Sequence, residues 1–213
     1  MSEAASRAGE VIVHARPAYT ISRTFLVGYL GLYHRFRIEG REHLPREGGV
    51  LIVSNHQSFL DIPVLAVAVP RHVAFVARAS LAQSRALNWL MREAGSVLIR
   101  PNTPDRAALE GMIEHLRRGD CVAVFPEGTR TLDGSMGEFR AGAVVAARRA
   151  GVPIVPAGIR GAFEAWPRKR GLPLPRSISV RFGPPIPPGG EGAIEAARAV
   201  IGEMIGDGRA AAR

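Results

Sequence analysis

The sequence predicts one α/β domain in which a mixed sheet of about seven strands is covered by helices. Short apolar runs alternate along the chain with longer segments whose apolar residues recur at helical spacing. The 213 residues are enough for one domain with a sizeable core, and the hydrophobic share of 46% is ordinary for a globular protein. The chain shows no internal repeat and no linker between domains.

The predicted strands are short and mostly apolar. The first alternates as an edge strand does, and the second is an apolar run after Gly48 and Gly49 that is typical of a buried strand. Pro153 and Pro156 frame a later strand and predict that it lies at an edge or wall of the sheet, since proline cannot donate to a ladder. The predicted strands cover residues 36–40, 50–53, 72–77, 97–99, 121–125, 153–159 and 178–182.

The predicted helices follow these strands. The clearest start is at Thr103, where an N-cap residue precedes a proline and then Asp105 in the first turn, and Gly119 ends this helix. Ser54 and Asn55 are predicted N-caps for the helix after the second strand. Besides a helix that ends near residue 69, the predicted helices cover residues 17–35, 80–94, 103–118, 141–150 and 194–205.

The two ends of the chain are predicted to lie outside the domain, which covers residues 36–206. We expect residues 1–16 to be loosely ordered and residues 207–213 to form a tail. The helix over residues 17–35 has large apolar residues at helical spacing beside arginines, which suits a membrane interface and equally a helix packed on the domain. The chain shows no signal-peptide pattern and no apolar run of the roughly 18–20 residues that a membrane span needs.

The charge of the chain restricts its partners. The net charge is +9 and the isoelectric point is near 11.1, which favours nucleic acid, an anionic membrane surface, or phosphorylated substrates. Residues 168–170, Arg-Lys-Arg, fit a solvated loop, or a contact with phosphate or membrane. Cys121 is the only cysteine, so the chain has no internal disulfide and no cysteine-based zinc site.

The first candidate site is the pair of His56 and Asp61, directly after the strand at residues 50–53. Strand-to-helix junctions are common places for chemistry in α/β proteins. Residues five apart in one helix point about 140° away from each other. The two can therefore meet only if His56 lies in the turn or first helical residue and Asp61 reaches back from the helix. A carboxylate on one imidazole nitrogen leaves the other free as a base. We expect surface or packing roles for the other five histidines, which we predict to lack such a partner.

The second candidate site is the segment 125–130, Phe-Pro-Glu-Gly-Thr-Arg, which also follows a buried strand. Glu127 can accept a hydrogen bond from a substrate hydroxyl, Arg130 suits bidentate phosphate binding, and Gly128 permits close approach of the backbone. A structural ion pair between Glu127 and Arg130 explains the same residues. Arg140 adds a cation at a helix start.

These segments resemble the motifs of the glycerolipid acyltransferases with the His-x4-Asp motif, in particular the lysophosphatidate (1-acyl-sn-glycerol-3-phosphate) acyltransferases. Residues 55–61 resemble the first motif of that family, 125–130 the third and 152–156 the fourth, and 180–186 resemble its closing strand and turn. The second motif differs, because Arg100 comes one residue earlier than the family's arginine. In a strand, a shift of one residue turns a side chain to the opposite face.

The resemblance implies that a fatty acyl group moves from acyl-CoA or acyl carrier protein to the free hydroxyl of lysophosphatidate, giving phosphatidate. It implies a peripheral protein on the cytoplasmic face of the membrane, with no cofactor and no metal. It assigns catalysis to His56 and Asp61 and substrate binding to Glu127, Gly128, Thr129, Arg130, Arg100 and Arg140.

Two alternatives remain. One is an acyltransferase of the same fold that uses another acceptor, such as glycerol-3-phosphate, another lysophospholipid or a lyso-aminolipid, and the displaced Arg100 keeps it open. The other is a non-enzymatic basic protein that binds membrane or nucleic acid. We expect no nucleic-acid partner, because the chain lacks a basic-aromatic nucleic-acid motif.

Overall fold

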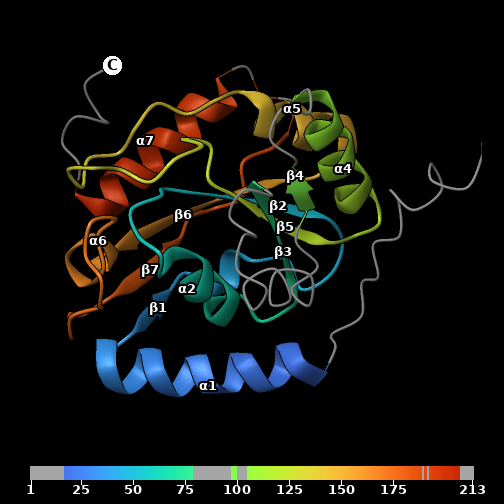
Figure 1. Cartoon of the computed structure of the whole chain (residues 1–213). Coiled ribbons are helices and arrows are strands. Elements are labelled where there is room, and N and C mark those ends of the chain that lie inside the picture. The colour runs from blue at the N-terminus through green and yellow to red at the C-terminus, as the bar shows by residue number, and fades with distance from the viewer. Residues whose placement is uncertain (1–16, 79–96, 100–104, 189, 191, 207–213) are drawn as a thin grey trace, which may run out of the picture.

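The sheet is the centre of the structure. The computed structural model describes residues 17–78, 97–99, 105–188, 190 and 192–206. Within these residues, seven strands form one sheet in the order β1-β7-β6-β2-β5-β3-β4 (Figure 1). The strands are β1 (Arg37–Glu39), β2 (Val50–Ser54), β3 (Val73–Arg78), β4 (Val97–Ile99), β5 (Cys121–Val124), β6 (Ile154–Arg160) and β7 (Ser179–Phe182). The predicted α/β class and the strand number are confirmed.

Helices cover both faces of the sheet (Figure 1). The described helices are α1 (Pro17–His34), the short 3-10 helix η1 (Arg41–His43), α2 (Asp61–Ala68), α4 (Asp105–Arg117), α5 (Gly142–Ala150), α6 (Ala162–Ala165) and α7 (Ala193–Ile205). The first core cluster joins one face of the sheet to α1, α2 and α6, and the second joins the other face to α4, α5 and α7. The predicted helix at 80–94 lies outside the described residues.

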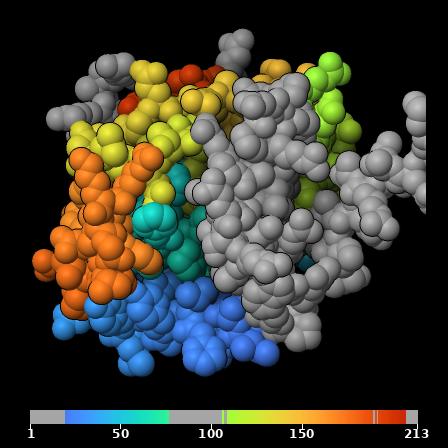
Figure 2. All heavy atoms as spheres, viewed as in Figure 1, coloured from blue at the N-terminus to red at the C-terminus, as the bar shows by residue number. Residues whose placement is uncertain are grey.

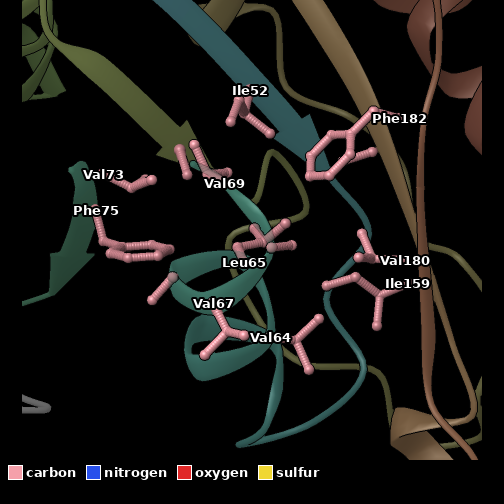
Figure 3. Close-up of a cluster of buried hydrophobic side chains, with 14 of the residues drawn as sticks. Ile52, Val64, Leu65, Val67, Val69, Val73, Phe75, Ile159, Val180 and Phe182 are labelled. Atoms are coloured by element: carbon pink, nitrogen blue, oxygen red, sulfur yellow. The ribbon is translucent and has the colours of Figure 1, made fainter. Parts of the chain in front are cut away.

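The side chains of β2 alternate between the two faces of the sheet, so this one apolar strand contributes to both core clusters. All five of its residues are buried. Val50 and Ile52 belong to the first cluster, while Leu51 and Val53 belong to the second, because successive side chains of a strand point to opposite faces. Figure 3 shows Ile52 in one apolar cluster with Leu65 of α2 and with residues of β3, β6 and β7. A strand buried on both faces is typical of a parallel sheet between helices.

The direction of the strands brings two loops together. β2 pairs in parallel with β5 on one side and with β6 on the other, whereas β6 and β7 are antiparallel. The carboxyl ends of β2 and β5 therefore lie at the same edge of the sheet. The segments that follow them, 55–60 and 125–140, meet there.

One prediction about the sheet is wrong. β6 lies between β7 and β2, not at an edge, although it contains Pro156. The carbonyl of Pro156 accepts a hydrogen bond from the N–H of Gly183, so the nitrogen of Pro156 also faces the β7 side of the strand. The β6–β7 ladder ends at the pair of Ala157 and Phe182, so the missing N–H of Pro156 falls just beyond it.

Two arginines bind the C-terminal end of α2. Arg23 of α1 donates to the carbonyls of Ala66 and Val67, each at 3.0 Å. Arg41 donates to the carbonyl of Ala68 at 2.8 Å. These cations satisfy carbonyls that have no partner within the helix and favour the negative end of its dipole. Arg23 also fixes α1 against α2, the helix that carries Asp61.

Candidate active site

The turn after β2 is shaped by Asp61. Residues 55–60 are not helical, and α2 begins at Asp61 with Leu60 as its N-cap. The prediction that Ser54 and Asn55 cap this helix is therefore wrong, because they lie too early in the chain. Oδ2 of Asp61 accepts the backbone N–H of Gln57 at 2.6 Å and that of Ser58 at 2.8 Å, so the carboxylate closes the turn.

The same oxygen of Asp61 holds His56. Nδ1 of His56 lies 2.8 Å from Oδ2 of Asp61, and Asp61 is fully buried. The carboxylate oxygen accepts hydrogen bonds, so Nδ1 carries the proton and Nε2 carries the lone pair. The imidazole stacks on Phe125, with ring centroids 4.1 Å apart, and 16% of its side chain is exposed. His56 is thus an oriented base whose second nitrogen is left for a substrate.

Glu127 holds the backbone of His56 from the neighbouring loop. Its Oε1 accepts the N–H of His56 at 2.7 Å, and its Oε2 accepts the N–H of Gly137 at 2.9 Å. A Cβ on Gly137 would lie 3.0 Å from Oε2, so the absence of a side chain permits this approach. Burial raises the pKa of Glu127, and the two N–H groups and the charge of His56 oppose that shift. In this structure, Glu127 braces the turn that presents the imidazole.

Two further contacts fix this turn on the sheet. The N–H of Thr131 donates to the carbonyl of His56 at 3.0 Å, so both backbone polar groups of His56 are bound to the loop after β5. The buried amide of Asn55 donates to the carbonyl of Ile159 at 2.9 Å and accepts its N–H at 2.8 Å. Asn55 therefore ties the turn to β6. The sequence pattern predicts no role for Asn55 in binding or catalysis, and its place beside His56 is the only local clue.

Arg130 lies over the ring of Phe59, which belongs to the same turn. Its guanidinium carbon is 3.5 Å from the ring centroid of Phe59, which is a cation–π geometry. Nη1 of Arg130 is buried and makes no hydrogen bond to any described residue. Glu127 does not pair with Arg130, since its two oxygens hold backbone N–H groups. Arg130 thus keeps donors for an anion near His56.

Three of the four remaining predicted binding residues lie on the same loop. Gly128 has a φ of 70°, a left-handed conformation that favours glycine, and a Cβ there would lie 3.5 Å from the Arg140 guanidinium. Gly128, Thr129 and Arg140 are exposed. Arg100 lies outside the described residues, so its place in the site stays a prediction.

A second His-x4-Asp pair lies elsewhere in the fold. Nδ1 of His115, near the end of α4, lies 2.9 Å from Oδ2 of Asp120, just before β5. The prediction that the other five histidines lack such a partner is therefore wrong for His115. This pair is at the amino end of β5, opposite the edge that holds His56, and His115 is only 2% exposed. A buried ring of this kind has a packing role.

The site lies open at the surface. Figure 2 shows the teal segment after β2 in a hollow between the yellow segment that follows β5 and the orange segment around α6. Among the described residues, no group of three or more His, Cys, Asp or Glu side chains is arranged to hold a metal ion. The assembled groups are a base with its orienting carboxylate and an arginine with unused donors, which suit proton removal next to an anionic group.

Comparisons with known proteins agree with these features. A family model described as Acyltransferase matches residues 35–160. The chloroplastic 1-acyl-sn-glycerol-3-phosphate acyltransferase LPAT1 of Arabidopsis thaliana is 34% identical over 138 residues, which are 63% of this chain and 38% of that protein. The lyso-ornithine lipid O-acyltransferase of Pseudomonas aeruginosa is 33% identical over 125 residues, which are 58% of this chain and 47% of that protein. The chain thus spans less than half the length of these two relatives.

A solved structure matches over more of its length. The crystal structure of the 1-acyl-sn-glycerophosphate (LPA) acyltransferase PlsC from Thermotoga maritima has a TM-score of 0.75 and 26% identity to this chain. The match covers 95% of this chain and 86% of that one. The likeness therefore includes the sheet, its helices and the edge that carries His56.

Proposed function

The chain belongs to the Acyltransferase family, and on that premise we propose that it acylates lysophosphatidate to phosphatidate. The donor is acyl-CoA or acyl carrier protein, and the acceptor is the free hydroxyl of lysophosphatidate. One observation carries the proposal: His56 is held through Nδ1 by buried Asp61, 2.8 Å away, beside an arginine with an unused donor. A base and an anion site side by side match an acceptor that has both a hydroxyl and a phosphate.

The proposed reaction needs only these residues. Nε2 of His56 removes the proton of the acceptor hydroxyl as its oxygen attacks the thioester carbonyl. Asp61 keeps the imidazole in the correct tautomer and stabilises the imidazolium. The tetrahedral intermediate then expels the thiolate, which takes the proton back from His56. In this scheme no acyl-enzyme forms and no cofactor takes part.

The other predicted residues take roles around this step. Arg130 binds the acceptor phosphate through the donors that its stacking on Phe59 leaves available. Gly128, Thr129 and Arg140 line the acceptor's path from the loop after β5. Glu127 acts through the backbone of His56, and its contact with acceptor stays a prediction.

A second acceptor class is supported by one finding. The similarity to a lyso-ornithine lipid O-acyltransferase fits a lyso-aminolipid acceptor, which would use the same base and the same thioester donor. Lysophosphatidate carries a phosphomonoester that Arg130 would bind, whereas a lyso-ornithine lipid has no such group.

An acceptor panel separates these functions. Thioester consumption is measured at one donor concentration with lysophosphatidate, glycerol-3-phosphate, a lysophosphatidylethanolamine and a lyso-ornithine lipid, using the wild type and His56→Ala. We expect the highest kcat/KM for lysophosphatidate and almost no turnover in the variant. A preference for the lyso-ornithine lipid would refute the proposed acceptor, and an equally active His56→Ala would refute the proposed base.

We further propose that α1 docks the protein on the cytoplasmic face of the membrane. Ile21, Phe25 and Leu32 are 60%, 78% and 90% exposed and lie at helical spacing on one side of α1. A lipid acceptor and a water-soluble donor both reach a protein bound at that surface, and the net charge of +9 favours anionic lipid. In the described part of the chain, no helix has the length and apolar character that a membrane crossing requires.

Vesicle sedimentation tests this docking. Removing α1 would expose the core around Leu30 and His34, so a point variant is the better tool. We expect Phe25→Asp to lower the fraction bound to anionic vesicles several-fold. The control is Ala196→Asp, which adds the same charge to an exposed position of α7, across the sheet from α1 (Figure 1). Equal loss in both variants would contradict docking through α1.

A further inference from the structure

The loop after α6 is bound to the turn that carries His56. Oγ of Ser58 donates to the carbonyl of Trp166 at 2.7 Å. The rings of Phe59 and Trp166 are in contact, with centroids 5.2 Å apart. Since Phe59 also carries the Arg130 guanidinium, the loop lies at the same platform as the proposed phosphate contact. Figure 2 shows the orange segment around α6 beside the teal turn.

The loop is itself a closed turn with Arg168 at its tip. The N–H of Arg170 donates to the carbonyl of Pro167 at 3.0 Å. The indole N–H of Trp166 donates to the carbonyl of Arg170 at 2.9 Å. These bonds set the backbone position of Arg168, whose side chain is exposed. Within the described ranges, Arg168 has no hydrogen-bond or ion-pair partner, so its donors are available.

The charges at this platform are not balanced. Burial lowers the pKa of Arg130, and the positive charge of Arg168 lowers it further, while the charge of Asp61 acts in the opposite direction. The hydrogen-bonded oxygen of Asp61 is occupied by His56, Gln57 and Ser58. Among the described residues, no carboxylate is bonded to Arg130 or to Arg168. Arg130 lies over Phe59, and Arg168 follows Trp166, whose ring contacts Phe59. Two guanidinium groups on such neighbouring segments suit an anion of more than one charge.

We propose that Arg168 is a second phosphate-binding residue, which together with Arg130 holds the phosphomonoester of the acceptor at the Phe59–Trp166 platform. A phosphomonoester carries about −1.5 to −2 charges near pH 7 and three acceptor oxygens, which two guanidinium groups can share. This inference rests on the proposed function for the identity of the acceptor. It gives Arg168 of the Arg-Lys-Arg segment a role in selecting phosphomonoester acceptors over neutral ones.

Kinetics of matched variants test the proposal. Arg168→Gln removes the cation. Arg168→Lys keeps the charge but lacks the planar set of guanidinium N–H donors. Lys169→Gln, the control, removes the neighbouring charge of the same turn. We expect Arg168→Gln to raise KM for lysophosphatidate about tenfold with little change in kcat and in the donor KM. We expect Arg168→Lys to recover part of the loss and Lys169→Gln to stay within twofold of wild type.

Three results would overturn the proposal. They are an unchanged KM for lysophosphatidate in Arg168→Gln, an equal rise in Lys169→Gln, and a rise in the donor KM alone, which would assign Arg168 to the phosphates of CoA. Isothermal titration calorimetry with inorganic phosphate, on wild type and Arg168→Gln, measures binding at the site without turnover. Weaker phosphate binding in the variant supports the site even if lysophosphatidate is not the acceptor, and equal binding contradicts it.

Discussion

Glu127→Gln distinguishes two roles for the same carboxylate. In the structure, its two oxygens accept the N–H groups of His56 and Gly137 at 2.7 and 2.9 Å. Gln has the same shape but offers one acceptor and one NH₂ group. In either orientation, one backbone N–H then faces a donor and loses its hydrogen bond.

The size of the effect follows from this geometry. Glu127 is 9% exposed, so water does not readily replace the lost acceptor. A buried polar group without a partner costs about 1–3 kcal/mol, and the remaining bond to a neutral amide is about half as strong as one to a carboxylate. The neutral amide of Gln avoids the cost of burying the carboxylate charge, which offsets part of this loss of stability. We expect the free energy of unfolding to fall by about 2 kcal/mol, a Tm shift of roughly 4–8 °C at this chain length.

The effect on turnover comes through His56. A displacement of the turn by about 1 Å can lower the rate about 100-fold, so we expect kcat to fall by about 10- to 100-fold. KM for the acceptor should stay within twofold, because both carboxylate oxygens are already bound to backbone N–H groups. Thioester consumption over a range of acceptor concentrations, together with thermal unfolding, measures both quantities. Glu164→Gln is the control, since Glu164 is exposed on α6.

The opposite pattern would refute this reasoning. If Glu127 binds the acceptor hydroxyl, as the sequence alone suggests, Glu127→Gln should raise the acceptor KM and leave Tm close to the wild-type value. A variant with normal stability and normal kcat would therefore exclude the bracing role.

Three further outcomes are expected. Asp61→Asn should lower kcat by about 10²- to 10⁴-fold in steady-state assays, because the imidazolium loses its carboxylate, and an active variant with native circular dichroism would contradict the dyad. Asn55→Ala should lower the unfolding free energy in urea by about 2–4 kcal/mol, since both backbone groups of Ile159 lose buried partners; a change under 1 kcal/mol would show that other groups replace them. Burial raises the pKa of the Cys121 thiol to about 12, so the native protein should resist iodoacetamide at pH 8 and react fully once unfolded in guanidinium, whereas rapid native labelling would mean that β5 opens.

The order of the elements followed from local patterns. The apolar run before His56 became β2, and the helix start around Asp105 was recognisable from its flanking residues. These features depend on side chains that are neighbours in sequence, where hydrophobic periodicity and capping chemistry act directly. The short helix α6 carries no such pattern and was not predicted, although it places the loop of Arg168.

The spacing of His56 and Asp61 was informative only together with its position in the chain. The same spacing joins His115 and Asp120, which form a contact of 2.9 Å, against 2.8 Å for His56 and Asp61. His56 follows a strand and lies at the carboxyl edge of the sheet, while His115 lies in the last turn of a helix and is packed at the opposite edge. Which pair reaches substrate depends on that edge and not on the spacing.

By itself, the sequence determined the α/β class, the succession of strands and helices, and the residue types that could remove a proton or bind a phosphate. The tertiary structure decided which of these residues touch each other. Glu127 reaches the backbone of His56 across 71 residues of chain, and Ser58 reaches the carbonyl of Trp166 across 108. Such contacts depend on strand order and register, which the packing of the whole sheet sets. Contacts between residues so far apart in the chain cannot be predicted from short stretches of sequence.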